Sequence, residues 1–124
     1  MQQVQVIFFK RAVDKVPIKD WLDDLKAKDR RKCLERIERL RNQGHELARP
    51  FAAYLRDDIY ELRVKSGNVN YRMLYFFQEK RAVVISHGLI KKTQNVSPTE
   101  IDRAIERKAE FERDPGRHTF EWEP

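Results

Sequence analysis

Three alternating apolar runs, joined by short turns, constrain the fold of this chain more than any other feature. The runs cover residues 59–65, 70–77 and 82–90, and their alternation and β-branched content are typical of strands. Residues 66–68, centred on Gly67, favour a tight hairpin turn, and residues 78–81 form the second connection. Strands joined by such short turns pair in antiparallel fashion. The sequence therefore predicts three neighbouring strands of one antiparallel sheet.

The residues before this sheet predict one further strand and two helices. Residues 4–9 indicate a short, buried strand, and Pro17 suits the first position of a helix. A second helix is expected after Asp29, its N-cap, and ends at Gly44 as a left-handed C-cap. The apolar stripes of the two helices are Ile18, Trp21, Leu22 and Leu25, then Cys33, Leu34, Ile37 and Leu40. Residues 45–58 show no clean period and are expected to form a loop.

A last helix follows the strands, because residues 97–100 have the spacing of a capping box with Pro98 at the first helical position. The order β-α-α-β-β-β-α places the chain in the α+β class, with a small, mainly antiparallel sheet. We expect the helices to cover one face of this sheet and the functional residues to lie on the other. Residues 1–113 would form the domain. Residues 114–124 would form a frayed or loosely packed tail, unless Phe120 and Trp122 dock elsewhere.

Composition narrows the class of partner. The net charge is +6 and the isoelectric point about 9.6, which favours a polyanion such as RNA, DNA or an acidic protein over a merely basic surface. A single cysteine, Cys33, excludes an internal disulfide. No apolar run reaches the roughly 18 residues of a membrane span, and no signal peptide is visible. We therefore expect a cytoplasmic protein that does not bind membranes.

Charged side chains recur along the three predicted strands. They are Glu61, Arg63 and Lys65 on one face of the first, Arg72 on the second, His87 on the third, and Lys91 and Lys92 at its end. Arg72 stands among apolar neighbours, where a cation is costly unless it meets an anion. That anion is either Glu61 in the free protein or a phosphate of a ligand.

These residue types suit cleavage of RNA without a metal or cofactor, by attack of a 2′-hydroxyl on the adjacent phosphorus. Arg63 and Arg72 would bind the phosphate through their planar forks. His87 or Glu61 would act as the base, and Lys91 or Lys92 as the acid. Further substrate contacts are expected from Arg56, Lys65, Glu61 and Tyr75, the last by stacking on a base. The alternatives are structural: a core tyrosine, a strand histidine and a solubilising pair of lysines.

Three segments also resemble a known family. They are Leu-Arg-Asp-Asp-Ile-Tyr-Glu-Leu-Arg at residues 55–63, Tyr-Arg-Met-Leu-Tyr at 71–75 and His-Gly-Leu-Ile-Lys-Lys-Thr at 87–93. In this order they resemble the phage-derived, HigB-like branch of the RelE/ParE toxin superfamily. The resemblance extends from Val4 to about Phe111.

The resemblance implies a toxin of a type II toxin–antitoxin module that cleaves mRNA on the ribosome and inhibits translation. Its partner would be a HigA-like helix-turn-helix antitoxin, through which the complex binds operator DNA. Arg72 matches the phosphate-binding arginine of such toxins, Arg63 matches a basic residue of the first hairpin strand, and Lys91 or Lys92 falls near a basic group after the last strand. Glu61 departs from the pattern, because several relatives have a basic residue there. A late tyrosine of some relatives has no counterpart, which makes His87 the better candidate for the base.

Two other functions fit the same fold. A ParE-like toxin would bind and poison DNA gyrase without catalysis, and a basic module would bind nucleic acid without toxicity. Because one fold serves many functions, the fold does not separate them. The cationic set favours the nuclease, because a protein that only binds another protein does not need it.

Overall fold

A six-stranded mixed sheet organises the chain, in a computed structural model that describes residues 3–124. The strand order is β2-β3-β4-β5-β1-β6. In chain order the strands are β1 (Gln5–Phe9), β2 (Ala52–Arg56), β3 (Ile59–Ser66), β4 (Val69–Gln78), β5 (Ala82–Lys91) and β6 (Thr119–Glu121). The helices are α1 (Pro17–Asp23), α2 (Ala27–Gln43) and α3 (Pro98–Arg113), with short 3₁₀ turns at Gly44–Glu46 and Pro115–His118. The predicted α+β class is confirmed.

The central hairpins form as expected. β3 pairs with β4, and β4 with β5, both antiparallel. Gly67 stands in the first turn with a φ of 60°, and Glu79 in the second with a φ of 55°. β1 then pairs parallel to β5, but only along Ala82 to Ile85. Beyond Ile85, the edge of β5 that faces away from β4 therefore has no strand beside it in the described chain, and α1 packs against β5 there.

The predicted helix starts are confirmed at two of three helices. Pro17 and Pro98 are the first residues of α1 and α3, and the Ser97 side chain accepts a hydrogen bond from the Thr99 amide. The expectation that Asp29 caps α2 is wrong, because α2 begins at Ala27. The Asp29 carboxylate instead accepts hydrogen bonds from the hydroxyls of Ser66 and Tyr71. These two partners come from β3 and β4, so local sequence did not reveal them.

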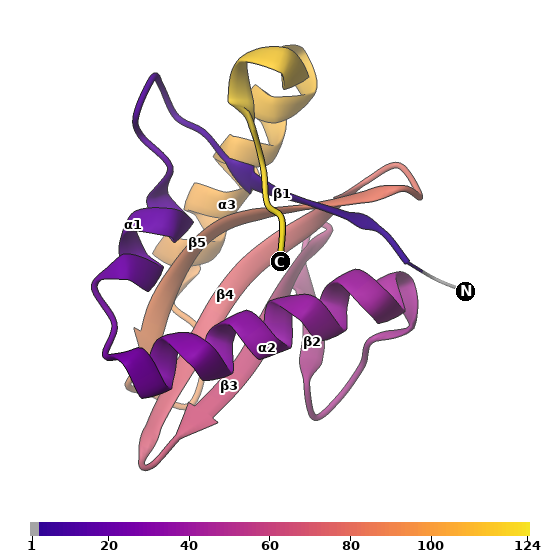
Figure 1. Cartoon of the computed structure of the whole chain (residues 1–124). Coiled ribbons are helices and arrows are strands. Elements are labelled where there is room, and N and C mark those ends of the chain that lie inside the picture. Colours follow the sequence, from indigo (N-terminus) through magenta and orange to yellow (C-terminus); the bar gives the residue numbers. More distant parts are fainter. Residues whose placement is uncertain (1–2) are drawn as a thin grey trace.

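Helices cover both faces of the sheet, and the prediction that they share one face is wrong. α1 and α2 pack on the face formed by residues such as Leu62, Met73 and Tyr75, and α3 packs on the face that presents Leu74 and Phe76. Figure 1 shows α2 crossing one side of the sheet and α3 behind it. The physical reason lies in β4, where residues 71–76 are all buried, so that both faces must be covered. None of the described helices is both long and apolar enough to cross a membrane.

Two strands were not predicted. β2 forms in the segment 45–58 that we expected to be a loop, and it pairs with β3. β6 forms in the tail and pairs with β1, so the expectation of a frayed tail is wrong. The rings of Phe120 and Trp122 stack on Phe8 at centroid distances of 6.0 and 6.2 Å. β6 has three residues, too few to show the alternation that identifies a strand in a sequence. The domain boundary at residue 113 stays a prediction.

Gly88 brings α1 close to β5, and this contact yields a test of the packing. A Cβ atom added to Gly88 would lie 2.4 Å from the indole ring of Trp21. We expect Gly88→Ala to lower the free energy of unfolding by about 1–3 kcal/mol, since the ring and α1 must move. Urea denaturation measures this. Gly116→Ala is the matched control, because nothing lies within 4 Å of its added Cβ; equal losses in both variants would contradict the packing.

Candidate functional site

A buried carboxylate joins two arginines on neighbouring strands. Arg63 of β3 lies directly opposite Arg72 of β4. One oxygen of Glu61 lies 2.8 Å from Nε of Arg63, and the other lies 3.2 Å from Nε of Arg72. Alternation along β3 and β4 places all three side chains on the face that α3 covers further along. The predicted convergence of Arg63 and Arg72 is therefore observed, and the expected ion pair between Arg72 and Glu61 is confirmed.

The Arg72 side chain is almost completely buried. Only 6% of the residue is exposed, and Glu61 is 3% exposed. Burial lowers the pKa of the Arg72 guanidinium, an effect that the Glu61 charge opposes. One terminal nitrogen donates a hydrogen bond to the Tyr71 carbonyl at 2.9 Å. Its Nε is close enough to Glu61 for an ion pair but is not aligned for a hydrogen bond. A buried donor left without an acceptor is unfavourable, so the free protein holds Arg72 at a cost in stability.

Lys91 extends the cationic group toward the start of α3. It shares a cavity of about 300 Å³ with Glu61, Arg63 and Arg56, and its Nζ donates to the Gln94 carbonyl at 3.1 Å. Arg56 lies 2.8 Å from Asp57 and 2.7 Å from Asp102. The hydrogen bond to Asp102, and then the one to Asp57, raise the pKa of Arg56. A ligand would therefore compete with two carboxylates for Arg56, whereas within residues 3–124 Lys91 donates only to a neutral carbonyl.

A second cavity, of about 280 Å³, adjoins the other side of Arg63. Lys65 and Arg72 line it, together with Arg36 from α2. The Arg36 guanidinium donates to the Arg63 carbonyl and lies 4.8 Å from the centre of the Phe51 ring. Sequence reasoning missed Arg36 as a site residue, because it is one of many basic residues on α2. Its signal was its distance of one helical turn from the buried Cys33, which turns it toward β3.

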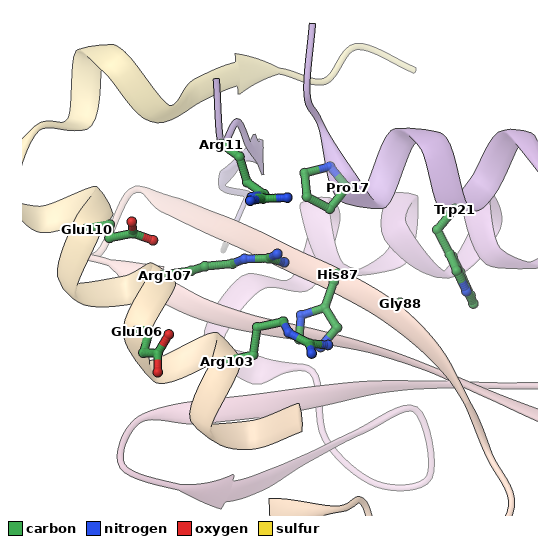
Figure 2. Close-up of a pocket in the computed structure, with 9 residues that line it drawn as sticks. All are labelled: Arg11, Pro17, Trp21, His87, Gly88, Arg103, Glu106, Arg107 and Glu110. Carbon is green, nitrogen blue, oxygen red and sulfur yellow. The ribbon is translucent and has the colours of Figure 1, made fainter. Parts of the chain in front are cut away.

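His87 does not join this group, so its predicted place beside Arg63 and Arg72 is wrong. It is buried and lines a different cavity, with Arg103 and Arg107 of α3 (Figure 2). Its Nε2 lies 3.0 Å from Glu100 and its Nδ1 lies 2.7 Å from the Ser86 hydroxyl. Burial, and then the charge of Arg107, lower its pKa to about 4. The physical reason is that α3 covers this part of the sheet face.

Two further expectations change with the fold. Tyr75 lies in the core on the opposite face, where it stacks on Tyr60 with centroids 5.4 Å apart. It is 1% exposed, and burial raises its pKa, so the expectation that Tyr75 stacks on a substrate base is wrong. Lys92 is exposed after the end of β5 and lines none of the cavities described here. Of the two lysines, the structure brings Lys91 to Arg63.

The sequence also matches a known family. Residues 20–109 match the profile described as phage-derived protein Gp49-like (DUF891). This chain belongs to the Gp49-like family. The match runs from α1 into α3 and contains Glu61, Arg63, Arg72 and Lys91. The family is associated with toxins of toxin–antitoxin modules that have RelE-like folds, which implies an antitoxin partner. No curated protein matches the sequence.

Neutralising the shared carboxylate should expose the cost of the buried arginine. We expect Glu61→Gln to lower the free energy of unfolding by about 3 kcal/mol, because Arg72 would remain buried without a counter-charge. Urea denaturation measures the loss. Glu38→Gln is the matched control, since its 2.6 Å pair with Arg41 is about a third exposed and should contribute less than about 1 kcal/mol. A small loss for Glu61→Gln would contradict the role given to this carboxylate.

The lowered pKa of His87 predicts a pH dependence of stability. Its ordinary pKa is 6.5 and its pKa in the folded protein is about 4, so the unfolded chain binds the proton more tightly. Stability is therefore present above about pH 6.5 and is lost as the pH falls toward 4. We expect the urea midpoint to decrease over this range in the wild type and to decrease less in His87→Gln. An unchanged slope in His87→Gln would contradict the assignment.

Proposed function

We propose that this protein is the toxin of a type II toxin–antitoxin module and a metal-independent, ribosome-dependent mRNA endoribonuclease. The observation that carries the proposal is the pair of arginines, Arg63 and Arg72, held around one carboxylate on the sheet. Two planar forks aimed at one anion match the oxygens of a phosphodiester. The association of the Gp49-like family with RelE-like toxins supports the same conclusion.

The proposed reaction uses the groups around these arginines. In the free protein Glu61 occupies the place that a phosphate would take. When RNA binds, its phosphate accepts hydrogen bonds from Arg63 and Arg72, and Glu61 is released to accept the proton of the 2′-hydroxyl. The 2′-oxygen attacks phosphorus, and the arginines stabilise the charge that develops on the phosphorane oxygens. The bond to the 5′-oxygen then breaks.

Lys91 is the proposed acid in this scheme. It shares the cavity of Arg63 and Glu61 and would donate a proton to the departing 5′-oxygen, leaving a 2′,3′-cyclic phosphate on the other fragment. The Glu61 carboxylate replaces His87 as the proposed base, since Glu61 contacts both arginines whereas His87 lines a different cavity and its Nε2 is bound to Glu100. Lys65 and Arg36 line the adjoining cavity and would hold the neighbouring phosphate of the strand.

The proposed partners are those that such a toxin requires. A HigA-like antitoxin with a helix-turn-helix domain would neutralise it, and the complex would bind operator DNA. The ribosome and mRNA would be its targets. A reading frame for a helix-turn-helix protein directly beside this gene would support the proposal, and co-purification of the two proteins would test it.

Removing Arg72 tests the nuclease. We expect expression of the wild type to arrest growth and to produce translation-dependent mRNA cuts. Arg72→Ala should reduce cleavage by about two to three orders of magnitude, since a fixed cation at the developing charge is lost. Mapping mRNA 5′ ends after induction measures this, and circular dichroism of the purified variant checks its fold. Arg113→Ala, in the exposed last turn of α3, is the control. Intact mRNA together with a supercoiling defect would instead indicate a gyrase poison.

A further inference from the structure

A third cavity, also lined by arginines, lies on the other side of α3 from the two cavities that adjoin Arg63. It has a volume of about 600 Å³ and opens between α1, α3 and the edge of β5 that lacks a strand partner. Arg11, Arg103 and Arg107 line it, with Pro17 and Trp21 contributed by α1. Among the described residues, none lines both this cavity and the two cavities that adjoin Arg63. It is therefore a separate feature of the molecule.

Three guanidinium groups line this cavity, together with the carboxylates of Glu106 and Glu110. Figure 2 shows those of Arg11 and Arg107 directed into the same space and that of Arg103 beside His87. Within residues 3–124, Arg107 donates only to neutral acceptors, the carbonyl and hydroxyl of Ser86 at 3.1 and 3.4 Å. Arg11 has no side-chain hydrogen bond or ion pair to a described residue, and Arg103 pairs with Glu100 at 2.7 Å. Burial, then the charges of Arg103 and Arg11, lower the pKa of Arg107 to about 10.

A network of hydrogen bonds, buried at Ser86 and His87 and exposed at Arg103, holds two of these arginines in place. The Ser86 hydroxyl contacts both Arg107 and the His87 ring, and the same ring contacts Glu100, which binds Arg103. The chain of contacts thus runs from Arg107 through β5 to Arg103 on α3. Like charges fixed near one another are costly in the free protein, and an anion relieves that cost without any rearrangement of the arginines.

We propose that this cavity is a second phosphate site, which binds the backbone of single-stranded RNA apart from the Arg63–Arg72 site. Guanidinium groups arriving from α3 and from the segment before α1 can reach different oxygens of one tetrahedral phosphate. Trp21 and Pro17 supply an apolar wall that suits a ribose or base. Glu106 and Glu110 on α3 line the same cavity and repel either kind of anion, so the choice of RNA rests on the apolar wall, for which a run of acidic residues has no matching group. The site concerns RNA binding and does not rest on cleavage.

Affinity measurements test the site directly. Fluorescence anisotropy with a short labelled single-stranded RNA should show that Arg11→Gln and Arg107→Gln each weaken binding by about tenfold. Each should also reduce the salt slope of the binding constant by about 0.7, the value for one phosphate contact on a single strand. Arg113→Gln removes the same charge from an exposed position of α3 and should change the affinity less than twofold by comparison. Arg107 donates hydrogen bonds to Ser86, so Arg107→Gln could destabilise the fold. The Arg11 side chain has no hydrogen bond or ion pair to a described residue, so Arg11→Gln decides the result in that case.

The two tryptophans give an independent readout in the wild-type protein. Trp21 lines the cavity, whereas Trp122 stacks on Phe8 beyond β6. In nuclear magnetic resonance spectra, titration with the RNA should shift the indole N–H resonance of Trp21 and leave that of Trp122 in place. Arg11→Gln should weaken the Trp21 response in parallel with its affinity.

Two outcomes would overturn the inference. In the first, Arg11→Gln and Arg107→Gln bind RNA as tightly as the wild type, while Arg72→Ala binds it less tightly. RNA would then contact the Arg63–Arg72 site and not this cavity. In the second, Arg11→Gln and Arg107→Gln lose affinity for a poly-glutamate peptide and keep their affinity for RNA. The cavity would then bind an acidic protein. Failure of the proposed nuclease is distinguishable, because it would appear as intact mRNA in cells with these RNA affinities unchanged.

Discussion

A single carboxylate, buried between two arginines of adjacent strands, is the interaction on which the candidate site depends. Glu61 contacts both Arg63 and Arg72, and it is nearly inaccessible to solvent. A buried cation without a partner would be strongly destabilising, so the carboxylate allows the fold to carry Arg72 in its sheet. The same carboxylate keeps two guanidinium groups aimed at one point. The same three side chains therefore stabilise the fold and form the proposed site. In the free protein the Glu61 carboxylate occupies the position that the RNA phosphate would take.

The position of α3 determines how the rest of that sheet face is used. By packing over Leu74 and Phe76 it buries the middle of the face and leaves cationic groups on both sides of itself. On one side lie Arg63, Arg72 and Lys91. On the other lie Arg103 and Arg107 of α3, which line the cavity of about 600 Å³. An RNA strand bound to both would pass along or around α3, which would make this helix a determinant of how substrate is held.

Much of the site could be predicted because it follows from alternation along hairpin strands. Once Gly67 sets the first turn, Arg63 must face Arg72, and Glu61 must share their side of the sheet. Alternation also puts His87 on this face, opposite Leu74, but it does not show that α3 covers that part of the face. The His87 ring is removed from the group by Glu100, a residue whose sequence spacing predicted only a helix cap. Tyr75 failed for a related reason: its strand is apolar on both faces, so nothing local indicates which side belongs to the core of α1 and α2.

What the sequence by itself determined was local: the three central strands, the turns between them, the proline-marked helix starts and the register that pairs two arginines. These depend on backbone preferences and on side-chain alternation, which act over a few residues. The tertiary structure alone decided that helices occupy both faces, that the tail returns as β6 beside β1, and that Arg11 and Arg107 line one cavity beside the edge of β5 that lacks a strand partner. Those contacts join segments far apart in the chain. They are selected by the need to bury two apolar faces at once, and no short stretch of residues carries that requirement.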